Sequence, residues 1–393
     1  MTTLVRPLQL RSVAAANPAR KVTWLELFFD LVFVAAVAQV AEPLREDLSI
    51  GGIVRFSVLF VLIWWAWIGN SVFATRFDSD DGLQRLLTLL QMFAVAAMAA
   101  NAGDGLDSRS SAGFAAAYAV VRFLLVAQYA RARRIGSART LATRYFVGHG
   151  LAAALWLASA VLPAPGRFAI WTVALAIDLG TPWMAVRHSV AVPPDASHLP
   201  ERFGLFTLIL LGESVVAVMH GMKGQEDWSV PAASAAFFGM AIAFMLWWWY
   251  FDGAAAAADR HVRTHRDALA SQIWSYAHLP LYLGIAVAFS GVARIVHEGA
   301  AEALHGQDGL VISGALAVAM LALAVIGESP SSARQLPQRA RQLALAALAI
   351  VIGAAASHIP AVLVVMALTT LCLLQIAVLN MGRAATAGGV TAH

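Results

Sequence analysis

Two acidic residues lie one helical turn apart in an apolar stretch near the N-terminus. The stretch TWLELFFDLVFVAAVAQV begins at Thr23 and contains Glu26 and Asp30. Residues at i and i+4 share one face of a helix, and two carboxylates that close in a low dielectric repel each other when both are ionised. At least one of them is therefore expected to hold a proton or to meet a cation. Proton transfer, cation binding or acid–base catalysis would use such a pair.

Three more ionisable residues stand inside apolar stretches of the second half. Glu213 follows Gly212 in LILLGESVVAV, Asp252 follows the aromatic run WWWYF, and His278 precedes Pro280 in YAHLPLYLG. Ionisable groups inside a membrane are costly and usually face a protein interior or a cavity. With the two carboxylates of the first stretch, these residues are predicted to bind protons or substrate in one polar cavity that opens to the cytoplasm.

A second group of charged residues is predicted to support that cavity or to lie at its rim. It comprises Asp78, Asp81, Arg85, Arg122, Glu201 and Arg202. Arg122 is the expected counter-ion of the carboxylate pair. The segment RFDSDDGLQR is expected to form an ion-pair or helix-cap network, and His149 and Asp178 are expected to be structural. For Glu26, Asp30, Glu213 and His278 the alternative is interhelical hydrogen bonding without a functional role.

The composition indicates a membrane protein. Of the 393 residues, 60% are hydrophobic and 13% are charged, and mean hydropathy is +0.71, whereas soluble domains usually carry about 25% charged residues. The basic excess fits membrane topology and contact with anionic lipid, so no nucleic-acid partner is predicted. A single cysteine, Cys372, excludes an internal disulfide or a cysteine metal site. No metal and no cofactor is predicted.

Twelve stretches reach the length of about 20 mostly apolar residues that a membrane-spanning helix needs. Asn17 as N-cap and Pro18 at the first helical position would start the first helix early, placing its carboxylates about 12–18 Å along the axis, near the bilayer middle. The fold class is therefore all-α and polytopic. The expected spans are 19–41, 53–75, 84–101, 111–131, 142–162, 167–187, 202–221, 231–253, 271–295, 309–327, 340–356 and 359–380.

Lys and Arg are distributed unevenly between the two sides of these spans. One set of connections holds only Arg45, Arg109, Arg167 and Lys223, while the N-terminus, the other connections and the C-terminus hold most of the rest. By the positive-inside rule both termini are predicted to be cytoplasmic.

The chain matches itself in two places at one offset. When LELFFDLVFVA is laid over LILLGESVVAV, Asp30 meets Glu213, and the Trp64–Trp65 pair meets the Trp247–Trp248 pair. Six helices separate the copies, which predicts two parallel six-helix repeats, 18–190 and 198–382, with a site at their interface. Residues 1–17 and 383–393 are expected to be a flexible cytoplasmic tail and a disordered tail.

Several blocks of this chain resemble the bacterial low temperature requirement protein A (LtrA) family over about residues 21–380. The blocks are VTWLELFFDLVFVAAVAQ, RFDSDDGLQRLLTLLQMFAVAAMAAN, ERFGLFTLILLGESVVAV, WWWYFDGA and YAHLPLYLGIAV. Trp24 departs from the proline expected there in many members. The resemblance implies a multi-pass membrane protein but brings no settled reaction or substrate. It extends to Glu26, Asp30, Asp78, Asp81, Arg85, Glu201, Arg202, Glu213, Asp252 and His278.

Three functions fit these features. The first is a proton-coupled transporter or permease for an unknown small solute, with Asp30 and Glu213 as coupling pair; no nucleotide-binding motif is present, so an ion gradient would drive it. The alternative is a membrane-embedded enzyme that acts on an apolar or biosynthetic substrate with a carboxylate/His site. The third is a non-catalytic factor that responds to lipid state. The lipid bilayer is the expected partner, and the oligomeric state stays open.

Overall fold

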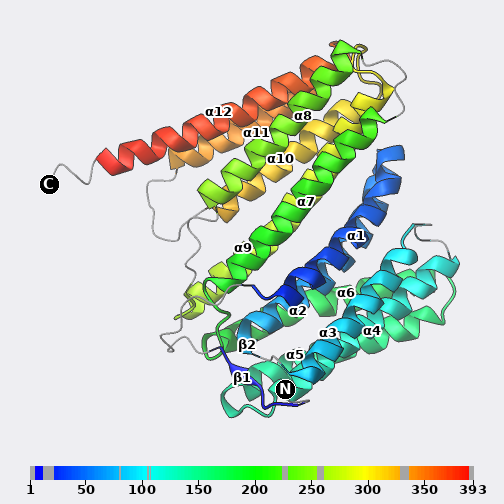
Figure 1. Ribbon diagram of the computed structural model, residues 1–393, viewed down its shortest axis with the longest axis vertical. Helices are drawn as coiled ribbons and strands as arrows, with labels where there is room; N and C mark the ends of the chain where they lie inside the picture. The colour runs from blue at the N-terminus through cyan, green and yellow to red at the C-terminus, as the bar shows by residue number, and fades with distance from the viewer. Residues whose placement is uncertain are drawn as a thin grey trace. The chain divides into compact units, whose positions relative to one another are not determined.

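The computed structural model consists of long helices and one short β-ladder (Figure 1). It describes residues 5–11, 22–78, 81–103, 106, 108–223, 229–254, 261–327 and 336–388. In those ranges the α-helices are α1 (Trp24–Glu46), α2 (Ile50–Arg76), α3 (Gly82–Ala100), α4 (Ser108–Ala132), α5 (Arg139–Ala160), α6 (Gly166–Ala185), α7 (His198–Met222), α8 (Val230–Trp248), α9 (His265–Glu298), α10 (Asp308–Ile326), α11 (Leu336–Ala355) and α12 (Ala361–Gly388). The shorter segments are β1 (Gln9–Leu10), β2 (Phe77–Asp78), the 3-10 helices η1 (Gly136–Ala138) and η2 (Val186–Val190), and the π-helical η3 (Trp249–Ala254).

Ten helices in the described ranges are long and apolar enough to cross a membrane. The protein is therefore an all-α, multi-pass membrane protein, as its composition predicts. Helices α5 and α11 are outside this set. The count of twelve spans stays a prediction.

The N-terminal segment forms a short strand where the structure describes it. Strand β1 pairs antiparallel with β2, with Gln9 opposite Asp78 and Leu10 opposite Phe77, and the Arg11 N–H donates to the Arg76 carbonyl at 3.0 Å. Residues 9–11 of the tail expected over 1–17 thus have backbone partners at the end of α2 and in β2. Residues 1–4 and 12–17 of that tail lie outside the described residues. At the other end, α12 continues to Gly388, inside the expected disordered tail of 383–393; residues 389–393 lie outside the described ranges.

A local capping box determines where α1 begins. The Thr23 N–H and hydroxyl donate to Glu26 Oε2 at 2.8 and 2.9 Å, and the Glu26 N–H donates back to the Thr23 hydroxyl at 3.3 Å. Such a reciprocal pair satisfies two free donors of a helix start. The expected start near Asn17 and Pro18 lies outside the described residues. The placement of Glu26 deep in the helix is wrong, because this carboxylate belongs to the first turn of α1.

The chain divides into two compact units, each with segments from both sequence halves. The first unit comprises Met1–Glu42, Arg55–Phe206 and Ala258–Ser275, and the second comprises Pro43–Val54, Thr207–Ala257 and Tyr276–His393. In the first unit α3, α4, α5 and α6 pack in chain order, each against the next (Figure 1). In the second, α10 packs on α11, and α12 packs on both α11 and α8. The predicted repeat stays a prediction.

A fully buried group of polar residues joins three helices of the first unit. Asp178 on α6 lies 2.7 Å from Arg122 Nε on α4 and 2.6 Å from His149 Nδ1 on α5, and it accepts a hydrogen bond from the Tyr118 hydroxyl at 2.9 Å. Gly148 permits this approach, because a Cβ there would overlap the side chain of Thr181. Arg122 is therefore paired with Asp178, and its expected role as counter-ion of Glu26 and Asp30 is wrong. The α4 helix directs it toward α6.

Asp178→Asn is expected to destabilise the first unit strongly. Removing one partner of a buried ion pair leaves the other charge uncompensated, at about 3–5 kcal/mol. Thermal unfolding of the detergent-purified protein, followed by tryptophan fluorescence, measures the loss.

In the double variant with Arg122→Met, the loss is expected to be smaller than the sum of the two single losses. Glu302→Gln, at an exposed position in the second unit, is the neutral control. Additive losses would mean that the two side chains do not interact.

Candidate functional site

One arginine lies between the two carboxylates of α1. Arg202 Nη2 on α7 lies 2.7 Å from Asp30 Oδ1, and Nη1 of the same guanidinium lies 4.0 Å from Glu26 Oε1. Arg202 and Asp30 are buried, at 0% and 1% exposure. The cation that the sequence requires beside this pair is thus a protein side chain. The Arg202 guanidinium contacts both carboxylates, and its shorter contact is with Asp30.

Helix α2 completes the surroundings of Asp30. Trp67 Nε1 donates to the same Oδ1 at 2.8 Å, which satisfies a buried indole N–H. Arg202 also donates to the Ser71 hydroxyl at 3.1 Å. Among the described residues, Asp30 Oδ2 and Arg202 Nε and Nη1 are buried without a hydrogen-bond partner. Buried polar groups are nearly always bonded, so the unbonded Oδ2 distinguishes Asp30 from Asp178, both of whose oxygens have partners.

The other carboxylate, Glu26, is partly exposed and meets several donors. His198 Nε2 lies 3.2 Å and Arg11 Nη2 3.7 Å from Glu26 Oε1. Asp195 holds the start of α7, since its Oδ1 accepts from the N–H of His198 at 2.9 Å. Burial would raise the pKa of Asp195, but the backbone donors of residues 197 and 198 hold it below its usual value.

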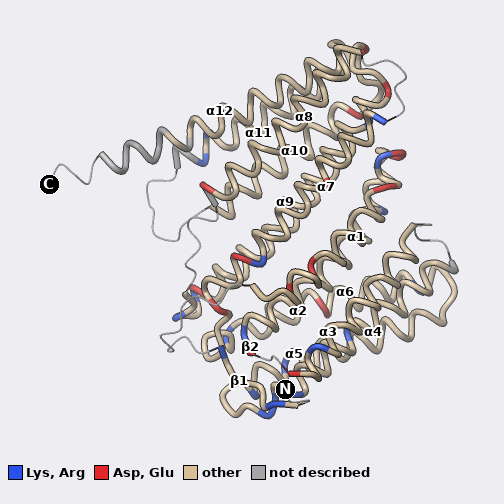
Figure 2. The backbone as a smooth tube through the Cα atoms, in the orientation of Figure 1, with Lys and Arg blue, Asp and Glu red and all other residues tan. Residues whose placement is uncertain are grey.

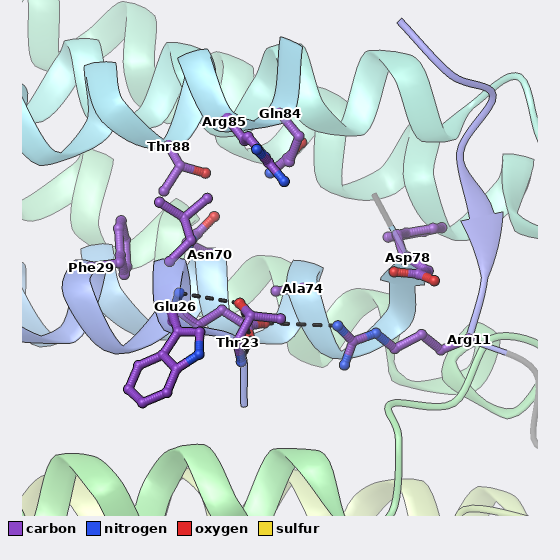
Figure 3. Close-up of a pocket in the computed structure, with 13 residues that line it drawn as sticks. Arg11, Thr23, Glu26, Phe29, Asn70, Ala74, Asp78, Gln84, Arg85 and Thr88 are labelled. Atoms are coloured by element: carbon purple, nitrogen blue, oxygen red, sulfur yellow. Dashed lines mark hydrogen bonds and ion pairs between the residues drawn. The ribbon is translucent and has the colours of Figure 1, made fainter. Parts of the chain in front are cut away.

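Glu26 lines a pocket of about 400 Å³ in the first unit. Figure 3 shows Gln84, Arg85 and Thr88 of α3 on the side opposite Glu26 and Thr23. The remaining lining is partly polar and partly aromatic, and it comprises Arg11, Trp24, Leu25, Phe29, Asn70, Ala74, Phe77 and Asp78. Pockets of this size hold small molecules. Two predicted rim residues, Asp78 and Arg85, therefore line the same space as Glu26.

Asp81 anchors the beginning of α3 beside this pocket. Its Oδ1 accepts from the Gln84 N–H, and its Oδ2 accepts from the Arg6 N–H, both at 2.8 Å, and lies 2.6 Å from Arg131. The expected cap and ion-pair role in RFDSDDGLQR is confirmed for this residue. Burial would raise the pKa of Asp81, but these hydrogen bonds and the Arg131 charge outweigh it and hold the pKa below its usual value.

The remaining predicted residues have other surroundings. In the second unit, Glu213 pairs with Arg45 at 3.0 Å, His278 is buried with Nε2 3.1 Å from the Tyr250 hydroxyl, and Asp252 is exposed within η3. In the first unit, Glu201 is largely exposed on the first turn of α7, near His198. The structure thus joins Asp30 and Glu213 each to a different arginine.

Sequence reasoning missed three residues of this site: His198, Arg11 and Trp67. A signal existed for the start of α1, because Thr23-x-x-Glu26 has the pattern of a capping box. The sequence signal for Trp67 was weaker: a tryptophan in a buried helix needs a partner for its N–H. Nothing local marks His198 or Arg11, because His198 is separated from Glu26 by 172 positions and Arg11 lies outside α1, directly after β1.

The arrangement favours proton and solute chemistry over cation binding. The position between the two carboxylates, where a cation would bind, is held by the Arg202 guanidinium. Within the described ranges, no three His, Cys, Asp or Glu side chains gather as a metal site would need. An acidic group with a buried free oxygen, one turn from a polar pocket, can take up and release a proton.

Comparison with known proteins decides the family. Residues 21–378 match the family model described as bacterial low temperature requirement A protein (LtrA). The chain belongs to the LtrA family. It is also 31% identical over 284 residues to the uncharacterized protein RA0937 of Rhizobium meliloti (strain 1021), a match that covers 67% of each chain. Neither the description of the LtrA family nor that of RA0937 states a reaction or a solute.

Replacing Asp81 is expected to destabilise this LtrA protein in a way that separates cap from charge. Asp81→Ala loses both, and the cap alone contributes about 0.5–2 kcal/mol. Asp81→Asn keeps a capping oxygen but loses the charge beside Arg131. Its melting temperature should therefore lie between those of the wild type and Asp81→Ala.

The difference between wild type and Asp81→Asn should also depend on pH. Because the folded pKa is lowered, the charge contribution is complete above the unfolded pKa of about 3.9 and is lost as pH falls through the folded value. Melting curves at pH 7 and at successively lower pH check this. A gap that widens below pH 4 would contradict it.

Proposed function

We propose that this LtrA protein is a secondary transporter that couples proton movement to a small polar solute, with Asp30 as proton carrier and the adjacent pocket as solute site. The observation that supports it is the shared guanidinium of Arg202, which contacts Asp30 and reaches toward the pocket residue Glu26. A group placed between a proton site and a solute site can make each respond to the other.

The proton site is the oxygen of Asp30 that Arg202 and Trp67 leave unbonded. Both contacts use Oδ1, so a proton on Oδ2 leaves the Trp67 hydrogen bond in place. Protonation removes the charge that attracts Arg202. In the buried surroundings of Asp30, that change is worth more than it would be in water.

Arg202 then carries the change to the pocket. With Asp30 neutral, Glu26 is the nearest remaining carboxylate, and Nη1 is already within 4.0 Å of it. Moving the guanidinium toward Glu26 draws this carboxylate away from His198 and Arg11 and alters the charge that a solute meets. Solute binding and Asp30 protonation are thereby linked, and the linkage acts equally in both directions.

The pocket lining indicates the solute class. Charges of both signs, amides and hydroxyls occur beside three aromatic rings in about 400 Å³. Small pockets of this kind bind polar or zwitterionic molecules through a few placed polar groups. A long acyl chain would leave those polar groups without partners, at a cost in affinity.

The second repeat-related carboxylate, Glu213, enters the proposal as a partner of Asp30 in coupling. Asp30 of α1 pairs with Arg202 of α7, and Glu213 of α7 pairs with Arg45 of α1. Each helix thus supplies one carboxylate and one arginine, although the carboxylate comes first on α1 and the arginine comes first on α7. The support for the parallel repeat is the match of LELFFDLVFVA with LILLGESVVAV, in which Asp30 meets Glu213.

Asp30→Asn is expected to uncouple solute movement from protons. The full chain is reconstituted in liposomes, and panels of amino acids, organic acids, amines and sugars are screened with a pH-sensitive dye inside. For the solute found, the variant should lose more than about 90% of solute-driven proton flux while retaining solute exchange, because an amide does not titrate in this range. Glu26→Gln should weaken solute binding instead.

Glu302→Gln, which removes an exposed carboxylate elsewhere, should behave as wild type. The proposal fails if no solute in the panels moves with an imposed proton gradient, or if Asp30→Asn supports proton flux as well as wild type does.

A membrane-embedded enzyme with a carboxylate/His site is the second candidate. The observation that favours it is the contact between His198 and Glu26 at the pocket, since such a pair can exchange a proton with a bound substrate. Mass spectrometry of the solute recovered from the liposomes separates the two functions. A transporter returns it unchanged, and an enzyme returns a product.

We also propose that both termini face the cytoplasm of a bacterial plasma membrane. The uneven distribution of Lys and Arg along the chain supports this orientation. A fluorescent protein that folds only in the cytoplasm, fused to either end, is expected to be fluorescent. A dark fusion at either end, with the chain inserted and stable, would contradict the orientation.

A further inference from the structure

A long segment of the first unit carries basic residues and no acidic ones. Residues 108–177 contain no Asp, Glu or Lys, and apart from His149 their basic residues are arginines: Arg109, Arg122, Arg131, Arg133, Arg134, Arg139, Arg144 and Arg167. The guanidinium differs from an ammonium in presenting a planar set of donors that binds phosphate through two hydrogen bonds. The segment therefore has the composition of a phosphate-binding surface.

Three of these arginines have partners inside the protein. Arg122 pairs with Asp178, Arg131 pairs with Asp81, and Arg167 donates to the Ser111 hydroxyl. They are bound to the helix bundle and face no external ligand.

Four others lie around the turn that joins α4 to α5. Arg134, Arg139 and Arg144 are exposed, and the Arg133 guanidinium lies 4.7 Å from the centre of the Phe146 ring. No ion pair within the described ranges involves any of the four. Figure 2 shows Lys and Arg close together at the end of the bundle where α5 begins.

One face of α5 carries this charge directly into an apolar surface. Thr140, Arg144, Val147 and Leu151 follow at helical spacing on that face, and Val147 and Leu151 are 58% and 52% exposed. A hydroxyl and a guanidinium near the turn, followed by exposed aliphatic side chains, match a phosphate head group and the acyl chain below it.

We propose that the α4–η1–α5 turn, with its arginines 133, 134, 139 and 144, binds the phosphate head groups of anionic phospholipids. Its ligand is the lipid at the membrane surface, since the apolar face of α5 continues from the charges. Electrostatic attraction of this kind is worth about a fivefold change in affinity per arginine near an anionic surface. The proposal is independent of transport.

The test titrates phosphatidylglycerol into the detergent-purified full chain and counts bound lipid by native mass spectrometry, with phosphatidylcholine as the neutral lipid. The triple variant R134Q/R139Q/R144Q is expected to bind phosphatidylglycerol more than about tenfold more weakly. R55Q/R263Q/R266Q removes the same charge from exposed arginines elsewhere and should retain wild-type binding. Both triple variants should bind phosphatidylcholine with equal affinity.

Several outcomes would overturn the proposal. Equal loss of phosphatidylglycerol binding in the two triple variants would show that net charge alone matters. Wild-type binding in R134Q/R139Q/R144Q would show that these arginines do not bind the lipid. Competition by soluble glycerol phosphate at the lipid's own concentration would identify a site for free phosphate esters. If the triple variant does not fold, the single variants R134Q and R139Q are tested, and wild-type binding in both would contradict the proposal.

Discussion

The Arg202 guanidinium, between the two carboxylates of α1, is the interaction on which the first unit depends. Two carboxylates one turn apart cannot both stay ionised in a low dielectric without a cation, and Arg202 lies 2.7 Å from one and 4.0 Å from the other. Its position requires each neighbouring element to start in the correct register. The Thr23 capping box places Glu26 in the first turn of α1, and Asp195 holds the start of α7.

Two buried acidic residues of the same unit illustrate how burial can have different consequences. Asp178 meets an arginine, a histidine and a tyrosine through both of its oxygens. Such a group is stable as an ion and connects three helices. Asp30 uses one oxygen for Arg202 and Trp67, and the other has no partner among the described residues. This incomplete hydrogen bonding of a buried carboxylate is the feature on which the proposed proton-carrier role of Asp30 rests.

The sequence did not show which arginine is the counter-ion of the α1 carboxylates. Arg122 and Arg202 both occur in apolar helices, and sequence reasoning assigned the first to the α1 carboxylates. The packing of α4 against α5 and α6 takes Arg122 to Asp178 instead. Spacing along a helix shows which residues share a face, but it does not show which distant helix lies opposite. The capping box of α1 was visible locally, and the Asn17–Pro18 pattern competed with it as a helix start.

The sequence by itself determined the class of protein, the family and the positions at which charge enters apolar helices. These follow from composition and short-range periodicity, because a membrane imposes its length and polarity on each segment separately. Only the tertiary structure decided the partners: Arg202 for Asp30, His198 and Arg11 for Glu26, and Arg131 for Asp81. Those contacts join residues of different elements, and their energies depend on burial and orientation, which exist only once the helices have packed.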